Sequence, residues 1–179
     1  MLLVFLLLFL LGCIIAVVFC LNALVDTLRF GLPFVSTPRW AITWLRDNLQ
    51  LTEHDVVYEL GCGSAPLLVA LGRKFPAAKF IGIEIQWWPF LLAKWRTRRL
   101  ANVRIRSGDF LKEDLSSATV IYGFYITNFM PKVAKLLEQK LRAGVQIISF
   151  GFAIPDWTPT KEIANPKTGH GSKIQLYQK

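Results

Sequence analysis

The chain has 179 residues, with 21 lysines and arginines against 12 acidic residues and a formal net charge of +9. A hydrophobic content of 53%, with 12 glycines and 9 prolines, excludes collagen-like and disordered chains, and the length is enough for one domain with a sizeable core. The three cysteines and two histidines have no metal-ligand spacing, so we expect no metal site and no disulfide framework.

The N-terminal segment is almost entirely apolar, and within residues 1–25 only Gly12 and Asn22 fall outside the hydrophobic set. An uncharged run of this length matches the roughly 30 Å hydrocarbon core of a bilayer. A cleaved signal peptide, the alternative, requires a basic start and a shorter apolar core. We therefore predict a transmembrane helix anchor over 1–25, a juxtamembrane linker over 26–37 and a separate domain over 38–179.

Basic residues follow the apolar segment and none precedes it. The positive-inside rule then predicts a single-pass membrane protein with its large domain on the cytoplasmic side, and an organellar inner membrane is the less favoured setting. Six cations without an acid lie between residues 94 and 106, and they indicate either a face that docks on anionic lipid or a solvated helix face. These cations are Lys94, Arg96, Arg98, Arg99, Arg104 and Arg106.

After residue 37, short apolar runs alternate with amphipathic runs that open near a proline. The expected helices cover 38–48, 66–75, 89–100 and 131–142. The expected strands cover 55–60, 79–84, 103–106, 119–124 and 145–150, followed by a hairpin over 161–164 and 173–177. This alternation predicts an α/β, Rossmann-like fold with a mostly parallel sheet, helices on both faces and a ligand site at the carboxyl ends of the strands.

Acidic residues lie at the ends of three successive strands of this predicted sheet. Glu59 precedes a turn in which Gly61 and Gly63 permit a sharp bend and a close approach of the backbone to a ligand. Glu84 is placed to accept hydrogen bonds from ribose hydroxyls, and Asp109 to read an adenine amino group. The alternative is that the last two acids only cap strand-to-helix turns.

The spacing Glu59-x-Gly61-x-Gly63 resembles motif I of class I S-adenosylmethionine-dependent methyltransferases, with Ala65 in place of the third glycine. Further segments resemble the membrane-anchored lysine methyltransferase family, which includes the mitochondrial enzymes acting on the c-subunit of ATP synthase and on the adenine nucleotide translocase, with prokaryotic relatives. These segments are FVSTP (34–38), VYELGCG (57–63), GIEIQWW (82–88), IYGF (121–124), FMPK (129–132) and FAIPDWTP (152–159).

The resemblance implies a seven-stranded methyltransferase sheet with a C-terminal antiparallel hairpin, and S-adenosyl-L-methionine as the cofactor, released as S-adenosyl-L-homocysteine. Glu59, Gly61 and Gly63 would hold its methionine end, Glu84 its ribose and Asp109 its adenine. Three neighbours complete the expected cofactor-binding set, namely Cys62, Ile85 and Phe110.

For the acceptor side, we expect Tyr122, Phe124 and Tyr125 to line a channel that steadies a methylated cation, with Asn128 orienting the amine. An equally open alternative is that Tyr122 and Phe124 alternate through a core strand. The resemblance implies methylation of lysine side chains in a membrane or membrane-surface protein, without a nucleic-acid partner. Methylation of a lipid or small amphiphile, or non-catalytic cofactor binding, remain the alternatives.

Overall fold

The computed structural model describes residues 1–30, 36–125 and 129–179. The chain divides into two compact units, Met1–Phe34 and Val35–Lys179. The first unit contains one α-helix, α1 (Leu2–Phe30), of 29 residues. This helix continues beyond residue 25 into the stretch expected to be a linker.

The prediction of a single-pass membrane protein with its catalytic domain on the cytoplasmic side is wrong. Across the described ranges, no helix is both long enough and apolar enough to cross a membrane. The prediction rested on the uncharged, apolar run of residues 1–25.

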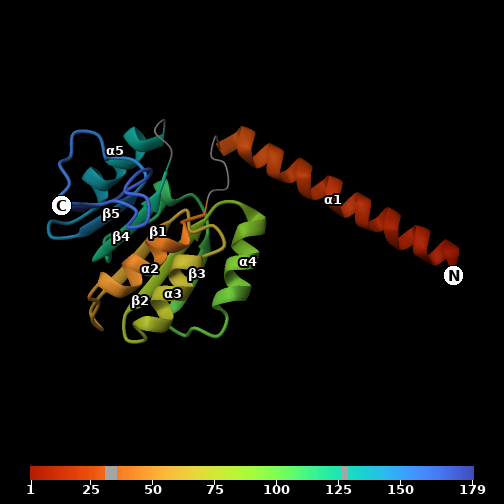
Figure 1. The fold of residues 1–179 in the computed structure, drawn as a ribbon, viewed down its shortest axis with the longest axis horizontal. Helices are drawn as coiled ribbons and strands as arrows, with labels where there is room; N and C mark the ends of the chain where they lie inside the picture. Colours follow the sequence, from red (N-terminus) through yellow and green to blue (C-terminus); the bar gives the residue numbers. More distant parts are fainter. Residues whose placement is uncertain (31–35, 126–128) are drawn as a thin grey trace. The chain divides into compact units, whose positions relative to one another are not determined.

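The second unit is a seven-stranded sheet with helices packed on it (Figure 1). Its strands are β1 (Val56–Leu60), β2 (Lys79–Glu84), β3 (Val103–Ser107), β4 (Val120–Phe124), β5 (Gln146–Phe150), β6 (Lys161–Ile163) and β7 (Ile174–Gln178). Its helices are α2 (Arg39–Asn48), α3 (Pro66–Lys74), α4 (Trp87–Thr97), the short 3-10 helix η1 (Phe110–Lys112) and α5 (Met130–Lys140).

The strand order β3-β2-β1-β4-β5-β7-β6 confirms the predicted sheet. Strands β1 to β5 pair in parallel, and β7 runs antiparallel between β5 and β6 as the expected final hairpin. From β1 the chain adds β2 and β3 on one side and then returns to place β4 on the other. Such a reversal leaves a crevice at the carboxyl ends of the strands, where α/β proteins bind their ligands.

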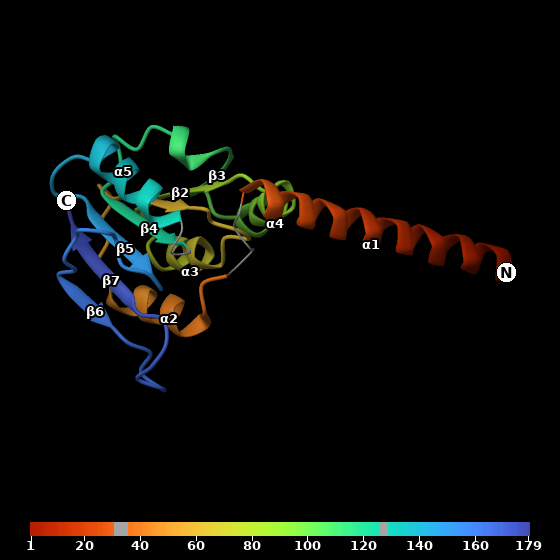
Figure 2. The same cartoon turned by 90° about the horizontal axis from the view of Figure 1, so that it is seen from above.

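Helices cover both faces of the sheet, with α2, α3 and α4 on one face and α5 on the other (Figure 2). Side chains of a strand point alternately to the two faces, so β1 contributes to two cores. Val57 packs with Leu67 and Phe80 beneath α2 and α3, whereas Leu60 packs with Ile147 beneath α5. The position of a residue in its strand therefore decides on which face of the sheet its side chain lies.

Three helix starts differ from the sequence prediction, by one residue in α2 and α5 and by two residues in α4. Helix α4 begins at Trp87, two residues before the expected Pro89, because proline is tolerated anywhere in the first turn, where backbone N–H groups have no partner within the helix. Helix α2 begins at Arg39, and no side chain caps it. The Thr37 hydroxyl, two residues before this helix, shares a hydrogen bond with the Tyr122 hydroxyl.

Candidate active site

The glycine-rich turn after β1 folds back against the end of β2. The backbone N–H groups of Gly61 and Cys62 both donate to the Ile83 carbonyl, at 2.9 and 3.0 Å. Gly61 and Gly63 take left-handed conformations, with φ of 77° and 54°, which glycine adopts without steric cost. These two glycines therefore have the role that the sequence predicted for them in the turn.

Ala65 stands where the methyltransferase pattern has its third glycine, and it takes the left-handed conformation too, with φ of 58°. For a residue with a Cβ this conformation costs about 1–2 kcal/mol. Ala65 is fully buried, and it immediately precedes helix α3. The backbone thus keeps the path of the glycine pattern despite the substitution.

Glu84, at the end of β2, ties the turn to the start of α4. Its Oε2 accepts a hydrogen bond from the Gly63 N–H at 2.7 Å, and its Oε1 accepts one from the Gln86 N–H at 2.8 Å. The side chain is only 6% exposed. Carboxylate oxygens accept more than one hydrogen bond each, so these contacts are compatible with further donors such as ribose hydroxyls.

Glu59 lies one strand away from Glu84, on β1, and is 4% exposed. Burial, together with the negative charge of Glu84, raises the pKa of Glu59 well above its ordinary range, although the Leu68 backbone N–H donates to its carboxylate. Its Oε2 has no hydrogen-bond partner in the described part of the chain. A buried carboxylate oxygen of this kind is suited to a cationic or hydrogen-bonding ligand group.

Asp109 and Phe110 follow β3, next to β2 in the sheet. The Asp109 carboxylate accepts a hydrogen bond from the Leu111 N–H at 3.0 Å and so caps η1. Phe110 is buried beside Tyr125, with ring centroids 5.6 Å apart. Asp109 therefore caps η1 through Oδ1, as in the structural alternative raised from the sequence.

Helix α4 holds the glycine-rich turn through a contact that the sequence analysis missed. Arg96 donates from Nη1 to the Ser64 hydroxyl at 2.6 Å and to the Ser64 carbonyl at 3.3 Å. These residues are 32 positions apart, so no local pattern links them. The sequence analysis had counted Arg96 only among the basic surface residues.

The six cations expected to form one basic face are divided between two surfaces. Arg104 and Arg106 alternate along β3 with Val103 and Ile105, which pack in the core beneath α3 and α4, so the two arginines point to the opposite face. Arg106 pairs with Glu113 at 3.2 Å. The other four belong to α4 and the turn after it, namely Lys94, Arg96, Arg98 and Arg99.

Tyr122 lies in the core, on the face of β4 covered by α2 and α3. It is 2% exposed, neighbours Glu59 in the strand register, and shares a 2.8 Å hydrogen bond with the Thr37 hydroxyl. Burial raises the pKa of Tyr122, so its hydroxyl stays protonated. The structure thus places the Tyr122 ring in the core, as in the alternative raised from the sequence, and its role toward an acceptor stays a prediction.

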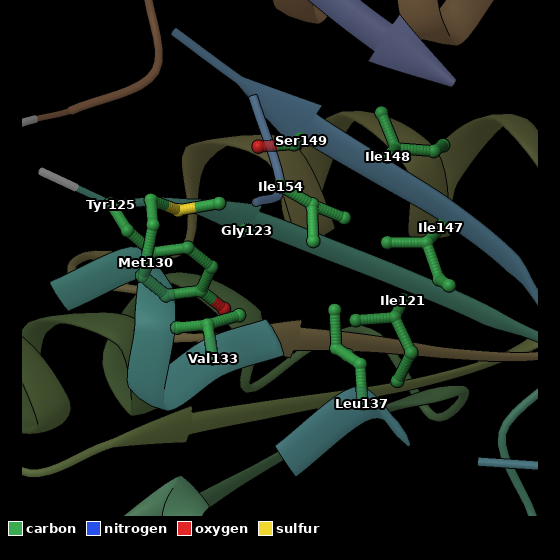
Figure 3. Close-up of a pocket in the computed structure, with 10 residues that line it drawn as sticks. All are labelled: Ile121, Gly123, Tyr125, Met130, Val133, Leu137, Ile147, Ile148, Ser149 and Ile154. Carbon is green, nitrogen blue, oxygen red and sulfur yellow. The ribbon is translucent and has the colours of Figure 1, made fainter. Parts of the chain in front are cut away.

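Tyr125, just after β4, folds back over the strand. A Cβ at Gly123 would collide with the Tyr125 ring, so only glycine leaves room for it there. The ring packs toward Met130 and Val133 of α5 (Figure 3). The cavity between β4, β5 and α5 that it helps to line has a volume of about 10 Å³, too small for a lysine side chain.

The Tyr125 hydroxyl is buried and has no hydrogen-bond partner among the described residues. Burial raises the pKa of Tyr125 well above its ordinary range. Asn128, expected to orient the amine, lies outside the described residues. Of the two expected tyrosines, Tyr122 is bonded to Thr37, and the Tyr125 hydroxyl has no partner among the described residues.

The described site residues fit the expected cofactor. Glu59, Glu84 and Asp109 lie at the carboxyl ends of three adjacent strands, and the turn beside them is bent by Gly61 and Gly63. The unsatisfied oxygen of Glu59 supplies an acceptor for an amino group, and Glu84 supplies acceptors for hydroxyls. Ile85 follows Glu84, and Cys62 lies buried within the turn.

Comparison with known proteins agrees with this geometry. Residues 59–161 match the ANTKMT methyltransferase domain. A protein-lysine N-methyltransferase of Saccharolobus islandicus is 30% identical over 156 residues, which cover 81% of this chain and 92% of the relative. Lysine N-methyltransferases named for the C-subunit of ATP synthase are 26% identical, that of mouse over 56% of this chain and that of rat over 72%. The matches span 41% and 59% of those two proteins.

Among solved structures, an RNA methyltransferase of Salinibacter ruber in complex with S-adenosyl-L-homocysteine superposes with a TM-score of 0.72. It is 24% identical, and the match covers 80% of this chain and 93% of that protein, so at this identity the likeness concerns the fold. The domain match extends over more than half of the chain and begins at Glu59 of the glycine-rich motif. The chain belongs to the family of ANTKMT-type methyltransferase domains and is an S-adenosylmethionine-dependent methyltransferase.

Proposed function

We propose that this methyltransferase acts on the side-chain amine of lysine in a protein substrate. The observation that carries the proposal is the whole-domain similarity to a relative named as a protein-lysine N-methyltransferase, which spans 92% of that relative. The mouse and rat relatives are likewise named for a lysine in a protein. Lysine in a protein is therefore the acceptor class that best fits the chain.

In this proposal each acid at a strand end binds a different part of the cofactor. Glu59 holds the methionine end together with Gly61 and Gly63, Glu84 the ribose, and Asp109 with Phe110 the adenine. When bound, S-adenosyl-L-methionine supplies an electrophilic methyl group on a positively charged sulfur. The Glu84 bond to the Gly63 N–H supports these roles, because it ties the glycine-rich turn to the end of β2.

The acceptor amine must lose its proton before it can attack, since a lysine ammonium has an ordinary pKa of about 10.4. A partly dry site favours the neutral amine, and alignment of this amine is the main contribution that the protein makes to the reaction. Tyr125 is our candidate for orienting it, because its buried hydroxyl has no partner among the described residues. Asn128 and Tyr122 complete the proposed acceptor side.

The test uses the full chain, proteins extracted from host cells and methyl-labelled S-adenosylmethionine. A matched sample of the same proteins is first acetylated, which blocks lysine amines and leaves arginine, histidine and carboxyl groups unchanged. We expect label in the protein fraction of the untreated sample and its loss in the acetylated one. Equal labelling of both samples would refute lysine as the acceptor, and label in a lipid extract would favour methylation of an amphiphile.

A further inference from the structure

Helix α4 carries an exposed apolar face that the proposed methyl transfer does not use. Trp87, Leu91 and Trp95 follow one another at intervals of four residues, with Trp88 alongside. They are 67%, 38%, 60% and 49% exposed, respectively. We refer to these four residues as the α4 tryptophan face.

This face is the outer side of a helix whose inner side is already packed. The buried residues of α4 are Pro89, Ala93 and Thr97, again spaced by four. At about 100° per residue they lie roughly opposite Leu91 and Trp95. Core packing therefore accounts for one side of the helix and leaves the tryptophans unexplained.

The exposed apolar area of the α4 tryptophan face is large enough to be functional. With about 250 Å² for a whole tryptophan, the exposed parts of the three tryptophans amount to roughly 440 Å². Patches of this size on monomers are often functional. A stable protein interface buries about 800 Å² on each partner, of which little more than half is apolar, so the charges around the face and not its area distinguish a second copy from a lipid surface.

The charges on α4 and on the residues that follow it up to position 108 are all positive. Arg98 lies over the Trp95 ring, with 4.5 Å between the guanidinium carbon and the ring centroid, and Lys94 lies 5.6 Å from the Phe90 centroid. No acidic residue occurs between Glu84 and Asp109. Two copies of such a surface would repel each other, whereas an anionic surface would attract it.

We propose that the α4 tryptophan face docks the protein peripherally on an anionic lipid surface. Tryptophan prefers the boundary between headgroups and acyl chains, and lysine and arginine beside it interact with anionic headgroups. A short helix lying flat on such a surface inserts its apolar side without spanning the bilayer. Trp87, Leu91 and Trp95 form the inserting side, and Lys94 and Arg98 contact the headgroups.

Docking at this face would bring the carboxyl edge of the sheet close to the lipid. Trp87 comes three residues after Glu84, and Arg96 of the same helix bonds to Ser64 in the glycine-rich turn. Proteins held at the lipid surface would then be the substrates within reach. This last consequence rests on the proposed function, whereas docking does not depend on it.

The experiment measures tryptophan fluorescence of the full chain with phosphatidylglycerol vesicles whose acyl chains carry bromine, a short-range quencher. Helix α1 contains no tryptophan, so any quenching reports on the second unit alone. One triple variant replaces the three α4 tryptophans by phenylalanine. The matched variant replaces the other three tryptophans, which are Trp40, Trp44 and Trp157.

We expect quenching in the wild type and in the matched variant, and a signal about threefold smaller in the variant without the α4 tryptophans. Removing two cations by Lys94→Gln and Arg98→Gln should weaken vesicle binding by about 30-fold, from about 1 kcal/mol per charge. The control pair Arg73→Gln and Lys74→Gln removes the same charge from α3 and should leave binding within about twofold of the wild type. Circular dichroism checks that each variant is folded.

Three results would overturn the proposal. The first is an absence of quenching in the wild type, and the second is equal quenching in the two triple variants. The third is self-association without vesicles that the α4 variant abolishes, which would assign the face to a second copy of the chain. Vesicle binding is measured without cofactor or substrate, so its failure is distinguishable from a failure of the proposed methyl transfer.

Discussion

Glu84→Gln tests the assignment of the cofactor site most sharply. Both carboxylate oxygens of Glu84 accept backbone hydrogen bonds, from Gly63 at 2.7 Å and from Gln86 at 2.8 Å. A glutamine amide keeps the shape but offers only one oxygen, so its NH₂ group must face one of two N–H donors. Because the side chain is 6% exposed, water does not replace the lost acceptor.

The size of the expected effect on cofactor affinity follows from the lost hydrogen bonds. A hydrogen bond to a charged group contributes about 1.5–3 kcal/mol. Loss of the Gly63 bond should lower the free energy of unfolding, whereas loss of an acceptor for a ribose hydroxyl should lower cofactor affinity. An affinity loss of about 1.5–3 kcal/mol corresponds to a Kd for S-adenosylmethionine roughly 10- to 150-fold higher.

Titration calorimetry with S-adenosylmethionine and S-adenosylhomocysteine measures this change. The matched control is Glu162→Gln, in the hairpin, where the carboxylate accepts from Lys173 Nζ at 2.7 Å and Gln175 Nε2 at 2.8 Å. We expect the control to leave Kd within about twofold of the wild type, since Glu162 lies in β6 of the hairpin, outside the proposed cofactor site. Loss of this partly exposed ion pair should also change the free energy of unfolding little. A folded Glu84→Gln protein with the Kd of the wild type would refute the ribose assignment.

Three further predictions concern buried groups of the site. Because burial raises the pKa of Glu59, the free energy of unfolding should fall as the pH rises above the ordinary carboxyl range, and Glu59→Gln should remove this fall. Urea denaturation at several pH values measures the free energy of unfolding, and the same dependence on pH in the wild type and the variant would contradict the prediction. The Thr37–Tyr122 bond should give a coupling of about 0.5–1.5 kcal/mol in a cycle of Thr37→Val and Tyr122→Phe, and strict additivity would count against it. Gly123→Ala should cost about 1–3 kcal/mol by displacing the Tyr125 ring, and an unchanged unfolding midpoint would show that the ring lies elsewhere.

Much of the fold could be predicted because apolar runs and turn residues are local signals. Strand β2 matches its predicted bounds, and β1 and β4 each begin one residue later than predicted. The acids of the site were found for the same reason, since a polar residue at the end of a buried strand stands out in the sequence. Parallel strands then bring those ends to one edge.

The missed features depend on contacts between distant parts of the chain. The Thr37 hydroxyl shares a hydrogen bond with Tyr122, which lies 85 positions later in the sequence, and no side chain caps the helix that follows Thr37. Arg96 reaches Ser64 across the packed surfaces of α4 and α3, although it looked like one of a run of surface cations. The position of Tyr125 depends on the missing Cβ of Gly123, a packing effect that strand alternation does not describe.

The membrane-spanning prediction was wrong for a different reason. It rested on the uncharged, apolar run of residues 1–25, whereas no helix within the described residues is both long enough and apolar enough to cross a membrane. The basic run from 94 to 106 was also judged as one surface, although strand alternation in β3 turns two of its arginines to the other face of the sheet. Composition alone identifies neither a spanning helix nor a continuous surface.

The most direct test of the central claim is to identify the amino acid that receives the methyl group. Proteins labelled by the full chain and methyl-labelled S-adenosylmethionine are hydrolysed in acid, and the labelled amino acids are separated beside the products of Glu84→Gln. The account predicts label in methylated lysine, reduced in the variant at limiting cofactor. Label in methylated arginine or histidine, or the same yield from the variant, would contradict it.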